Sequence, residues 1–158
     1  MKTLIALTIV GALALTAAAT STLQDKDKKP MELGNFSVSL TVKDIKVSKE
    51  FYEKLDFKQV AGNVDQKWVI VQNGTTTIGL FQGMFPRNTM TFNPGWTHKM
   101  ETLKDFQDVR EMQRALEKRG IQMTTKADEK TTGPASFTIA DPDGNPILFD
   151  QHVDSPKR

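Results

Sequence analysis

The sequence contains no cysteine. This absence excludes disulfide bonds, thiolate metal sites and a cysteine nucleophile, and it also excludes a lipidated cysteine at the start of a processed chain. A run of basic residues is missing too, because 21 Lys and Arg residues are interspersed with 19 Asp and Glu residues and the net charge is only +2. We therefore do not expect a nucleic acid as a partner.

The sequence also lacks the common short motifs of nucleotide and acyl chemistry. It contains no Walker loop, no GxGxxG glycine pattern and no nucleophile elbow. Its composition is otherwise ordinary for a soluble globular protein, with 38% hydrophobic and 25% charged residues. A chain of 158 residues is long enough for one domain with a core of its own.

Only the N-terminal end carries a long apolar run. Leu4–Leu15 follows the positive charge of Lys2, and Ala17-Ala18-Ala19 offers small residues for cleavage after Ala19. This order predicts a secretory signal peptide over residues 1–19. An uncleaved membrane anchor is the alternative, but a spanning helix needs about 20 strongly apolar residues, and this run changes to Ala and Thr too early. We therefore expect cleavage and no stable membrane span after it.

The expected product is an exported protein, located in a bacterial periplasm. Residues 20–32 are polar and charged, and we interpret them as a flexible linker. Residues 33–153 then form a single folded domain, and residues 154–158 are a short tail.

The first half of the domain is predicted to contain one strand, one helix and three further strands. Phe36–Val42 alternates apolar and polar residues, which indicates a half-buried strand. Asp44 is placed to cap a helix that continues to about Leu55. Three strands are expected after this helix, at residues 57–61, 67–72 and 76–82, with a tight Asn73-Gly74 turn between the last two.

The second half repeats this order. Asp108 caps a helix that ends at about Arg119, and Glu111 completes a capping box. Further strands are expected at residues 121–125, 135–139 and 146–152. The spacing that relates Asp44 to Asp108 also relates Phe57, at the first strand after one helix, to Ile121, at the first strand after the other. Two copies of a βαβββ unit are therefore predicted.

Two segments of the sequence are specific enough to indicate a family. LTVKDIKVSKEFYEKLDF after the first strand and DPDGNPILFD near the end, on a duplicated βαβββ unit, resemble the vicinal oxygen chelate superfamily. That group includes glyoxalase I, extradiol dioxygenases, fosfomycin-resistance enzymes and bleomycin-resistance proteins. The resemblance covers residues 33–153. It implies an α+β fold in which two modules, at about 33–85 and 97–153, form a cup-shaped mixed sheet.

The resemblance also implies where a metal would bind. Metal-dependent members hold a divalent ion with four inward His, Gln or Glu side chains, from the first and last strand of each module. In this sequence Ser37 stands seven residues before the capping Asp44, and the same step back from Asp108 gives Glu101 as its counterpart. The other two positions hold Gly79 and Leu148. Since only Glu101 is a competent ligand, we expect no metal cofactor by the family pattern.

A different ligand set stays open. A slip of three residues would place His98 at the position of Glu101, although His98 is otherwise an exposed loop histidine. Asp150 and His152 share a strand face with Leu148 because side chains alternate along a strand. Together with His98 or Glu101 they could bind a divalent metal such as Zn, Mn, Fe or Ni. The alternative is that Asp150 and His152 are exposed residues near the end of the chain.

The middle of the chain is rich in large apolar side chains, and residues of this kind line ligand pockets as well as cores and dimer interfaces. They are Trp68, Phe81, Met84, Phe85, Phe92 and Trp96. Residues 86–96 form a long connection between the modules, and such connections are often functional or interfacial. We expect Ser37, Ser39, Phe81 and Trp96 to contact a ligand.

Three functions are compatible with these features. The first is a metal-free protein that binds a small organic molecule in the cup or at a dimer groove. The second is a metal-dependent glyoxalase- or lyase-type enzyme, or a dioxygenase, with a non-standard ligand set. The third is a metal-free enzyme with Glu101 as its catalytic general base, its pKa raised in an apolar cup. The resemblance further implies a homodimer.

Overall fold

The structure, a computed structural model, describes residues 30–157. The predicted signal peptide (1–19) and most of the predicted linker (20–32) lie outside the described residues. The chain from Met31 onward forms one compact unit. No helix among residues 30–157 is both long and apolar enough to span a membrane.

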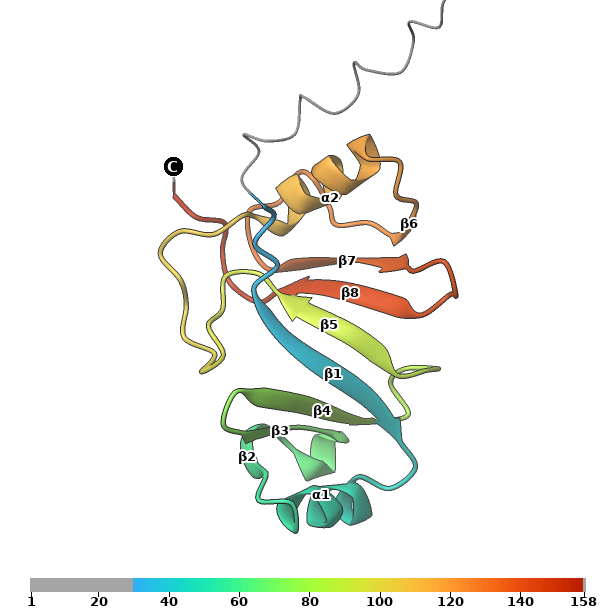
Figure 1. Ribbon diagram of the computed structural model, residues 1–158. Helices are drawn as coiled ribbons and strands as arrows, with labels where there is room; N and C mark the ends of the chain where they lie inside the picture. The colour runs from blue at the N-terminus through green and yellow to red at the C-terminus, as the bar shows by residue number, and fades with distance from the viewer. Residues whose placement is uncertain (1–29, 158) are drawn as a thin grey trace, which may run out of the picture. The chain divides into compact units, whose positions relative to one another are not determined.

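Residues 30–157 contain eight β-strands, two α-helices and one 3₁₀ helix (Figure 1). In chain order they are β1 (Asn35–Val42), α1 (Ile45–Glu53), β2 (Lys58–Asn63), the 3₁₀ helix η1 (Val64–Gln66), β3 (Trp68–Asn73), β4 (Thr76–Gln82), β5 (Thr89–Asn93), α2 (Val109–Lys118), β6 (Met123–Thr125), β7 (Ala135–Ala140) and β8 (Pro146–Gln151). All strands belong to one mixed sheet with the order β2-β3-β4-β1-β5-β8-β7-β6. The predicted α+β class is confirmed.

The sheet consists of two βαβββ modules that meet in its middle. In the first module β1 runs parallel to β4, and in the second module β5 runs parallel to β8. The first strands of the two modules, β1 and β5, pair with each other in antiparallel orientation. Figure 1 shows α1 and α2 at opposite ends of this sheet, each beside the strands of its own module. The duplicated architecture therefore agrees with the repeat in the sequence.

The second module begins earlier than predicted. Its first strand, β5 (Thr89–Asn93), lies inside residues 86–96, which were expected to be only a connection. Residues 94–108 then separate β5 from α2, whereas only residues 43–44 separate β1 from α1. The predicted module boundary at about residue 97 is therefore wrong. The spacing between the two helix caps cannot locate β5, because this longer connection lies between the strand and the helix.

A capping aspartate begins each helix, as predicted. The Asp44 side chain accepts hydrogen bonds from the backbone N–H groups of Lys46 and Val47. The Asp108 side chain accepts one from the backbone N–H of Arg110. These bonds satisfy N–H groups that have no partner within the helix.

A glutamine at the end of the last strand binds the start of the helix in each module. Gln82 Oε1 accepts a hydrogen bond from the Ile45 N–H at 3.0 Å, and Gln151 Oε1 accepts one from the Val109 N–H at 2.8 Å. Gly79 stands three residues before Gln82, and Leu148 stands three residues before Gln151. Alignment of the two last strands on these glutamines therefore pairs Gly79 with Leu148, as the sequence predicted.

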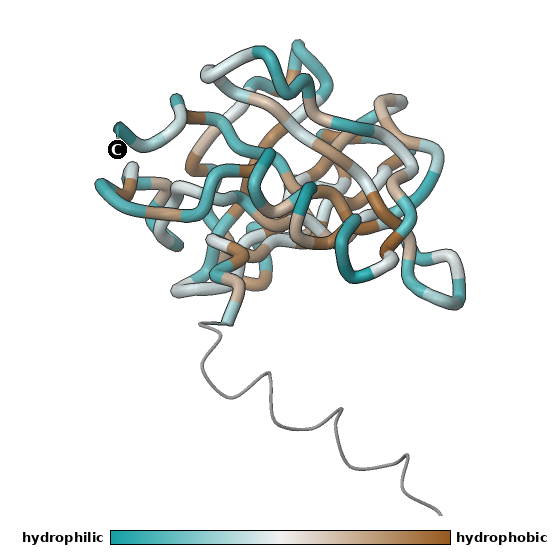
Figure 2. The backbone as a smooth tube through the Cα atoms, turned by 90° about the horizontal axis from the view of Figure 1, so that it is seen from above, coloured by the Kyte–Doolittle hydropathy of each residue, from teal (hydrophilic) through white to brown (hydrophobic). Residues whose placement is uncertain are grey.

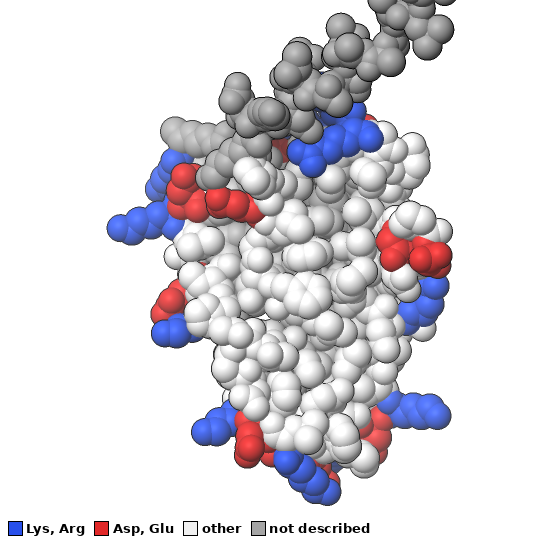
Figure 3. All heavy atoms as spheres, viewed as in Figure 1, with Lys and Arg blue, Asp and Glu red and all other residues white. Residues whose placement is uncertain are grey.

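Each helix covers its own half of the sheet and buries a separate apolar cluster. The first cluster contains Ile45, Val69, Val71 and Leu80. The second contains Val109, Met112, Ala127, Phe137, Ile139 and Phe149. Figure 2 shows hydrophobic segments in the interior and hydrophilic segments in the peripheral turns. In Figure 3, Lys, Arg, Asp and Glu lie around the edge of the face shown, and its centre over β1 and β5 is uncharged.

Replacement of Gln151 tests how strongly β8 and α2 depend on each other. Gln151 is fully buried, and its amide also donates to Asp108 Oδ2 and to the Val153 carbonyl. Gln151→Leu leaves the Val109 N–H and the Asp108 carboxylate without these partners. We expect urea denaturation to show a loss of about 2–3 kcal/mol in the free energy of unfolding. The matched variant Gln82→Leu removes one bond at a half-buried position and should cost about 1 kcal/mol; equal losses would contradict this account.

Candidate ligand-binding site

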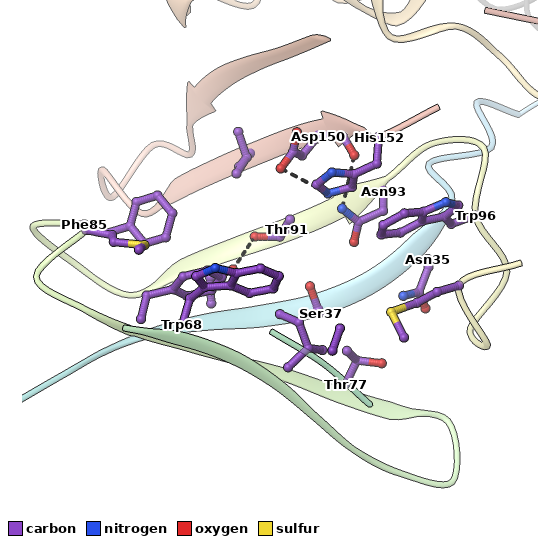
Figure 4. Close-up of a pocket in the computed structure, with 17 residues that line it drawn as sticks. Asn35, Ser37, Trp68, Thr77, Phe85, Thr91, Asn93, Trp96, Asp150 and His152 are labelled. Carbon is purple, nitrogen blue, oxygen red and sulfur yellow. Dashed lines mark hydrogen bonds and ion pairs between the residues drawn. The ribbon is translucent and has the colours of Figure 1, made fainter. Parts of the chain in front are cut away.

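A pocket of about 420 Å³ lies over the middle of the sheet (Figure 4). Its floor is formed by polar side chains that alternate along β1 and β5, with one contribution from β4. These residues are Asn35, Ser37, Ser39, Thr77, Thr91 and Asn93. The alternate residues of β1, such as Leu40, pack toward the core under α1. The polar side of the predicted half-buried strand therefore lines a pocket.

Hydrogen bonds fix the floor of the pocket. Ser39 Oγ and Thr91 Oγ1 share a buried hydrogen bond of 2.9 Å between β1 and β5. In the antiparallel ladder Ser37 lies directly opposite Thr91. The Asn93 side-chain amide donates to the Asp150 carbonyl at 3.1 Å, which connects β5 to β8. These neutral groups can donate to and accept from a bound molecule.

Aromatic side chains form the walls of the pocket. They are Trp68, Phe81, Phe85 and Trp96, and the thioethers of Met84 and Met100 lie beside them. The rings of Phe81 and Phe85 meet edge to face with 4.9 Å between their centroids. The site therefore combines a polar floor with apolar walls, an arrangement typical of pockets for small organic molecules.

Gly79 allows the Phe81 ring to lie close to β4. A Cβ atom at position 79 would come within 2.4 Å of this ring, which is closer than any van der Waals contact. The ring of Phe81 thus occupies the space that a side chain at position 79 would need.

Asp150, on the same face of β8 as Leu148, and His152, directly after the end of β8, both line the pocket. His152 Nε2 lies 3.3 Å from Asp150 Oδ2. The Trp96 ring stacks on the His152 ring with 4.3 Å between centroids and an interplanar angle of 15°. The carboxylate and the imidazole therefore hold each other at one wall of the pocket, and Trp96 covers the imidazole (Figure 4).

The Asp150 carboxyl is in an unusual environment for an acid. Burial raises its pKa above the ordinary value, because the charged form loses hydration. The neighbouring His152 acts on this pKa in the opposite direction, but it does not outweigh the burial. Acids with a shifted pKa in a pocket are more common at functional sites than elsewhere.

Glu101 does not occupy the position that the sequence assigned to it. It lies in the connection 94–108, is exposed and does not line the pocket. In the parallel ladders Ser39, and not the predicted Ser37, lies beside Gly79, and the residue in the same position beside Leu148 is Thr91 on β5. The prediction of Glu101 at an inward strand position is therefore wrong, because Glu101 belongs to the long connection 94–108 and not to a strand of the sheet.

His98 also lies in this connection and outside the lining of the pocket. Its backbone carbonyl accepts a hydrogen bond from the Gln72 side chain. The connection folds back on itself through hydrogen bonds between Thr97 and Glu101. The arrangement in which His98 or Glu101 faces Asp150 and His152 is therefore not formed.

The side chains at the four inward positions do not match the ligand set that the resemblance implies. Ser39 and Thr91 offer neutral hydroxyls, Gly79 has no side chain and Leu148 is an alkyl group. Within residues 30–157 no group of three or more His, Cys, Asp or Glu side chains is arranged to hold a metal ion. Asp150 and His152 are only two donors, at and just after the end of β8, whereas protein sites for transition metals usually have three or more ligands.

The four predicted ligand contacts, Ser37, Ser39, Phe81 and Trp96, all line the pocket. The sequence did not point to several other residues of its lining, among them Asn35, Thr77, Thr91, Asn93 and Met100. The alternation of polar and apolar residues in TMTFN (89–93) was the available signal for β5. That run is short and stands between Pro86 and Pro94, so the sequence pattern favours a connection there over a strand.

Comparison with known proteins gives one family and several similar folds. The family model described as Glyoxalase/Bleomycin resistance protein/Dioxygenase superfamily matches residues 36–149 of the 158. No curated protein matches the chain.

Three solved structures are similar in fold. One is described as an NAD-dependent benzaldehyde dehydrogenase from Legionella pneumophila, with 19% identity, a TM-score of 0.55 and coverage of 74% of this chain and 98% of that one. The second is a glyoxalase/bleomycin resistance protein/dioxygenase superfamily member from Vibrio splendidus 12B01, with 18% identity, a TM-score of 0.52 and coverage of 75% and 97%. The third is a hypothetical protein from Bacillus halodurans C-125, with 13% identity, a TM-score of 0.51 and coverage of 77% and 96%. At these identities the likeness concerns the fold alone.

Replacement of Asp150 tests the effect of the pocket carboxylate on stability. Because the folded-state pKa is raised, ionisation of Asp150 opposes folding at neutral pH, and this cost disappears as the pH falls through the folded-state pKa. We expect Asp150→Asn to raise the melting temperature at pH 7 by a few degrees and to flatten its dependence on acidic pH. Differential scanning calorimetry from about pH 7 to pH 4 would measure both effects. A lower melting temperature at neutral pH would show that the ion pair with His152 dominates instead.

Proposed function

Because the chain belongs to the glyoxalase/bleomycin resistance protein/dioxygenase superfamily, we propose that it uses the pocket of this fold to bind a small organic molecule without a metal. The observation that carries this proposal is the pocket of about 420 Å³ with a polar floor and aromatic walls. Pockets for small molecules typically measure about 300–1,000 Å³ and combine apolar walls with a few fixed polar groups.

The two kinds of surface suggest an amphiphilic ligand with a ring. Trp68 and Phe85 offer flat apolar faces, on which an aromatic ring can stack. Ser37 and Asn93 offer hydrogen-bonding groups on the floor. A molecule with one aromatic ring system and one polar group would contact both.

The proposal of a metal-free site rests on the chemistry of the residues at the centre of the sheet. Hydroxyl groups that already share a hydrogen bond, as in Ser39 and Thr91, are weak ligands for a divalent ion. Gly79 and Leu148 supply no donor at all. In the metal-dependent members that the sequence resembles, His, Gln or Glu side chains stand at these positions and hold the ion.

We further propose that the protein acts after export, in a bacterial periplasm, and as a homodimer. Export is supported by the signal-like anatomy of residues 1–19. Pairing of two copies is supported by Val47 (63%) and Phe51 (57%), large apolar side chains that lie one turn apart on α1 and are exposed on one chain. Groups of exposed apolar residues commonly mark interfaces.

A neutral aromatic alcohol tests the proposed binding. We expect 1-naphthylmethanol to bind with a dissociation constant of about 0.1–1 mM in isothermal titration calorimetry, because the affinity of so small a ligand is limited by its number of atoms. Ala61→Phe adds bulk inside the pocket lining and should weaken this binding by about tenfold or more. Val60→Phe, at the preceding position and outside the lining, is the matched control and should bind as the unaltered protein does. Equal binding by all three proteins would place the ligand elsewhere.

Metal analysis tests the other part of the proposal. Untagged protein, purified without added metal, should contain less than about a tenth of an equivalent of any transition metal, and added Zn²⁺, Mn²⁺, Fe²⁺ or Ni²⁺ should leave its melting temperature unchanged. A stoichiometric ion that is lost from both Asp150→Asn and His152→Gln would contradict the proposal. That result would favour a metal-dependent lyase or dioxygenase with a non-standard ligand set.

A further inference from the structure

The charged groups around the pocket are few and lie together. Asp150 and His152 are the only Asp, Glu, Lys, Arg or His residues in the lining that the structure describes. Between residues 30 and 157, no Lys or Arg side chain lines the pocket. The strongest fixed charge among these lining residues is therefore a carboxylate.

The pocket also contains no helix start. The start of a helix is a common backbone site for anions, since its N–H groups lack partners within the helix, but no residue of α1 or α2 is in the lining that the structure describes. An anionic ligand would thus meet Asp150 with only His152 to compensate.

The aromatic walls of the pocket favour a cationic ligand over an anionic one. Trp68, Phe81, Phe85 and Trp96 all line the same pocket as Asp150. The faces of such rings attract cations, most strongly in the case of tryptophan. The carboxylate is paired with His152 Nε2 at 3.3 Å, and an ionised carboxylate can accept about four hydrogen bonds. It therefore has capacity to accept from a second donor.

We propose that the pocket selects an organic cation, specifically a protonated aromatic amine whose ammonium group pairs with Asp150 and whose ring stacks between the tryptophans and phenylalanines. This inference rests on the proposed function, because it names the chemical class of the ligand for the same pocket. Burial of the Asp150 carboxyl, which raises its pKa, agrees with it, because a bound cation would restore the lost stabilisation of the charged form.

Three probes of equal size and different charge test the proposal. They are 1-naphthylmethylamine, 1-naphthylmethanol and 1-naphthoate, titrated by calorimetry at about pH 7.5, where the first is a cation and the last an anion. We expect the ammonium to bind about tenfold more tightly than the alcohol, and the carboxylate to bind more weakly than the alcohol.

Variants of the two charged residues identify the group responsible. Asp150→Asn keeps the shape and removes the charge, so the preference for the ammonium over the alcohol should fall below about twofold. His152→Gln removes the partner that competes for the carboxylate, so the preference should be kept or increase. Asp65→Asn removes an equal charge from an exposed position outside the pocket lining, and it should leave the preference unchanged. Binding of the alcohol to Asp150→Asn would show that this variant is folded.

The outcomes separate this inference from the proposed function. If the alcohol binds and the ammonium binds no more tightly, the pocket binds organic molecules but does not select cations, and the inference is overturned. Loss of the preference in His152→Gln but not in Asp150→Asn would also overturn it. If none of the three probes binds, the proposed function fails for aromatic ligands and the inference fails with it.

Discussion

The antiparallel pairing of β1 with β5 is the interaction on which the pocket depends. It joins the two modules, sets Ser37 opposite Thr91 and allows Ser39 and Thr91 to share a buried hydrogen bond. Side chains alternate between the two faces of a strand, so a slip of β5 by one residue along β1 would turn Phe92 toward the pocket and the hydroxyl group of Thr91 away from it. The parallel ladders to β4 and β8 then bring the walls of the pocket to this floor.

The two modules share a framework but contribute unequally to the site. In both, a glutamine at the end of the last strand holds the start of the helix, so each helix and its strand form one unit. The connection from first strand to helix is independent of that unit. In the second module it extends over residues 94–108 and brings Trp96 and Met100 to the pocket, whereas residues 43–44 in the first module contribute nothing to its lining.

The distribution of charge in the pocket follows from the same alternation. The centre of the sheet, with Ser39, Thr91, Gly79 and Leu148, carries no ionisable group. Charge appears instead two and four residues further along the chain from Leu148, at Asp150 and His152, on the face that Leu148 shares. Trp96 stacks on His152 and is supplied by the long connection of the second module. Asp150, whose pKa is raised by burial, thus lies beside the aromatic wall, where a ligand can compensate for its lost hydration.

The sequence by itself determined the elements with strong local signals. The aspartate caps at Asp44 and Asp108 and the alternation of Phe36–Val42 depend on neighbouring residues, and the α+β repeat followed from them. The tight turn between β3 and β4 was also predicted, but it lies at residues 74–75, one residue later than expected. The first strand of the second module could not be located, because so short a run carries little pattern and the spacing between strand and helix differs between the modules. Only the tertiary structure decided that Thr91 rather than Glu101 lies beside Leu148 on the neighbouring strand. It also decided that Asp150, His152 and Trp96 meet at one wall of the pocket. Strand pairing joins residues that are distant in the chain, and sequence spacing cannot fix a register that depends on a connection of arbitrary length.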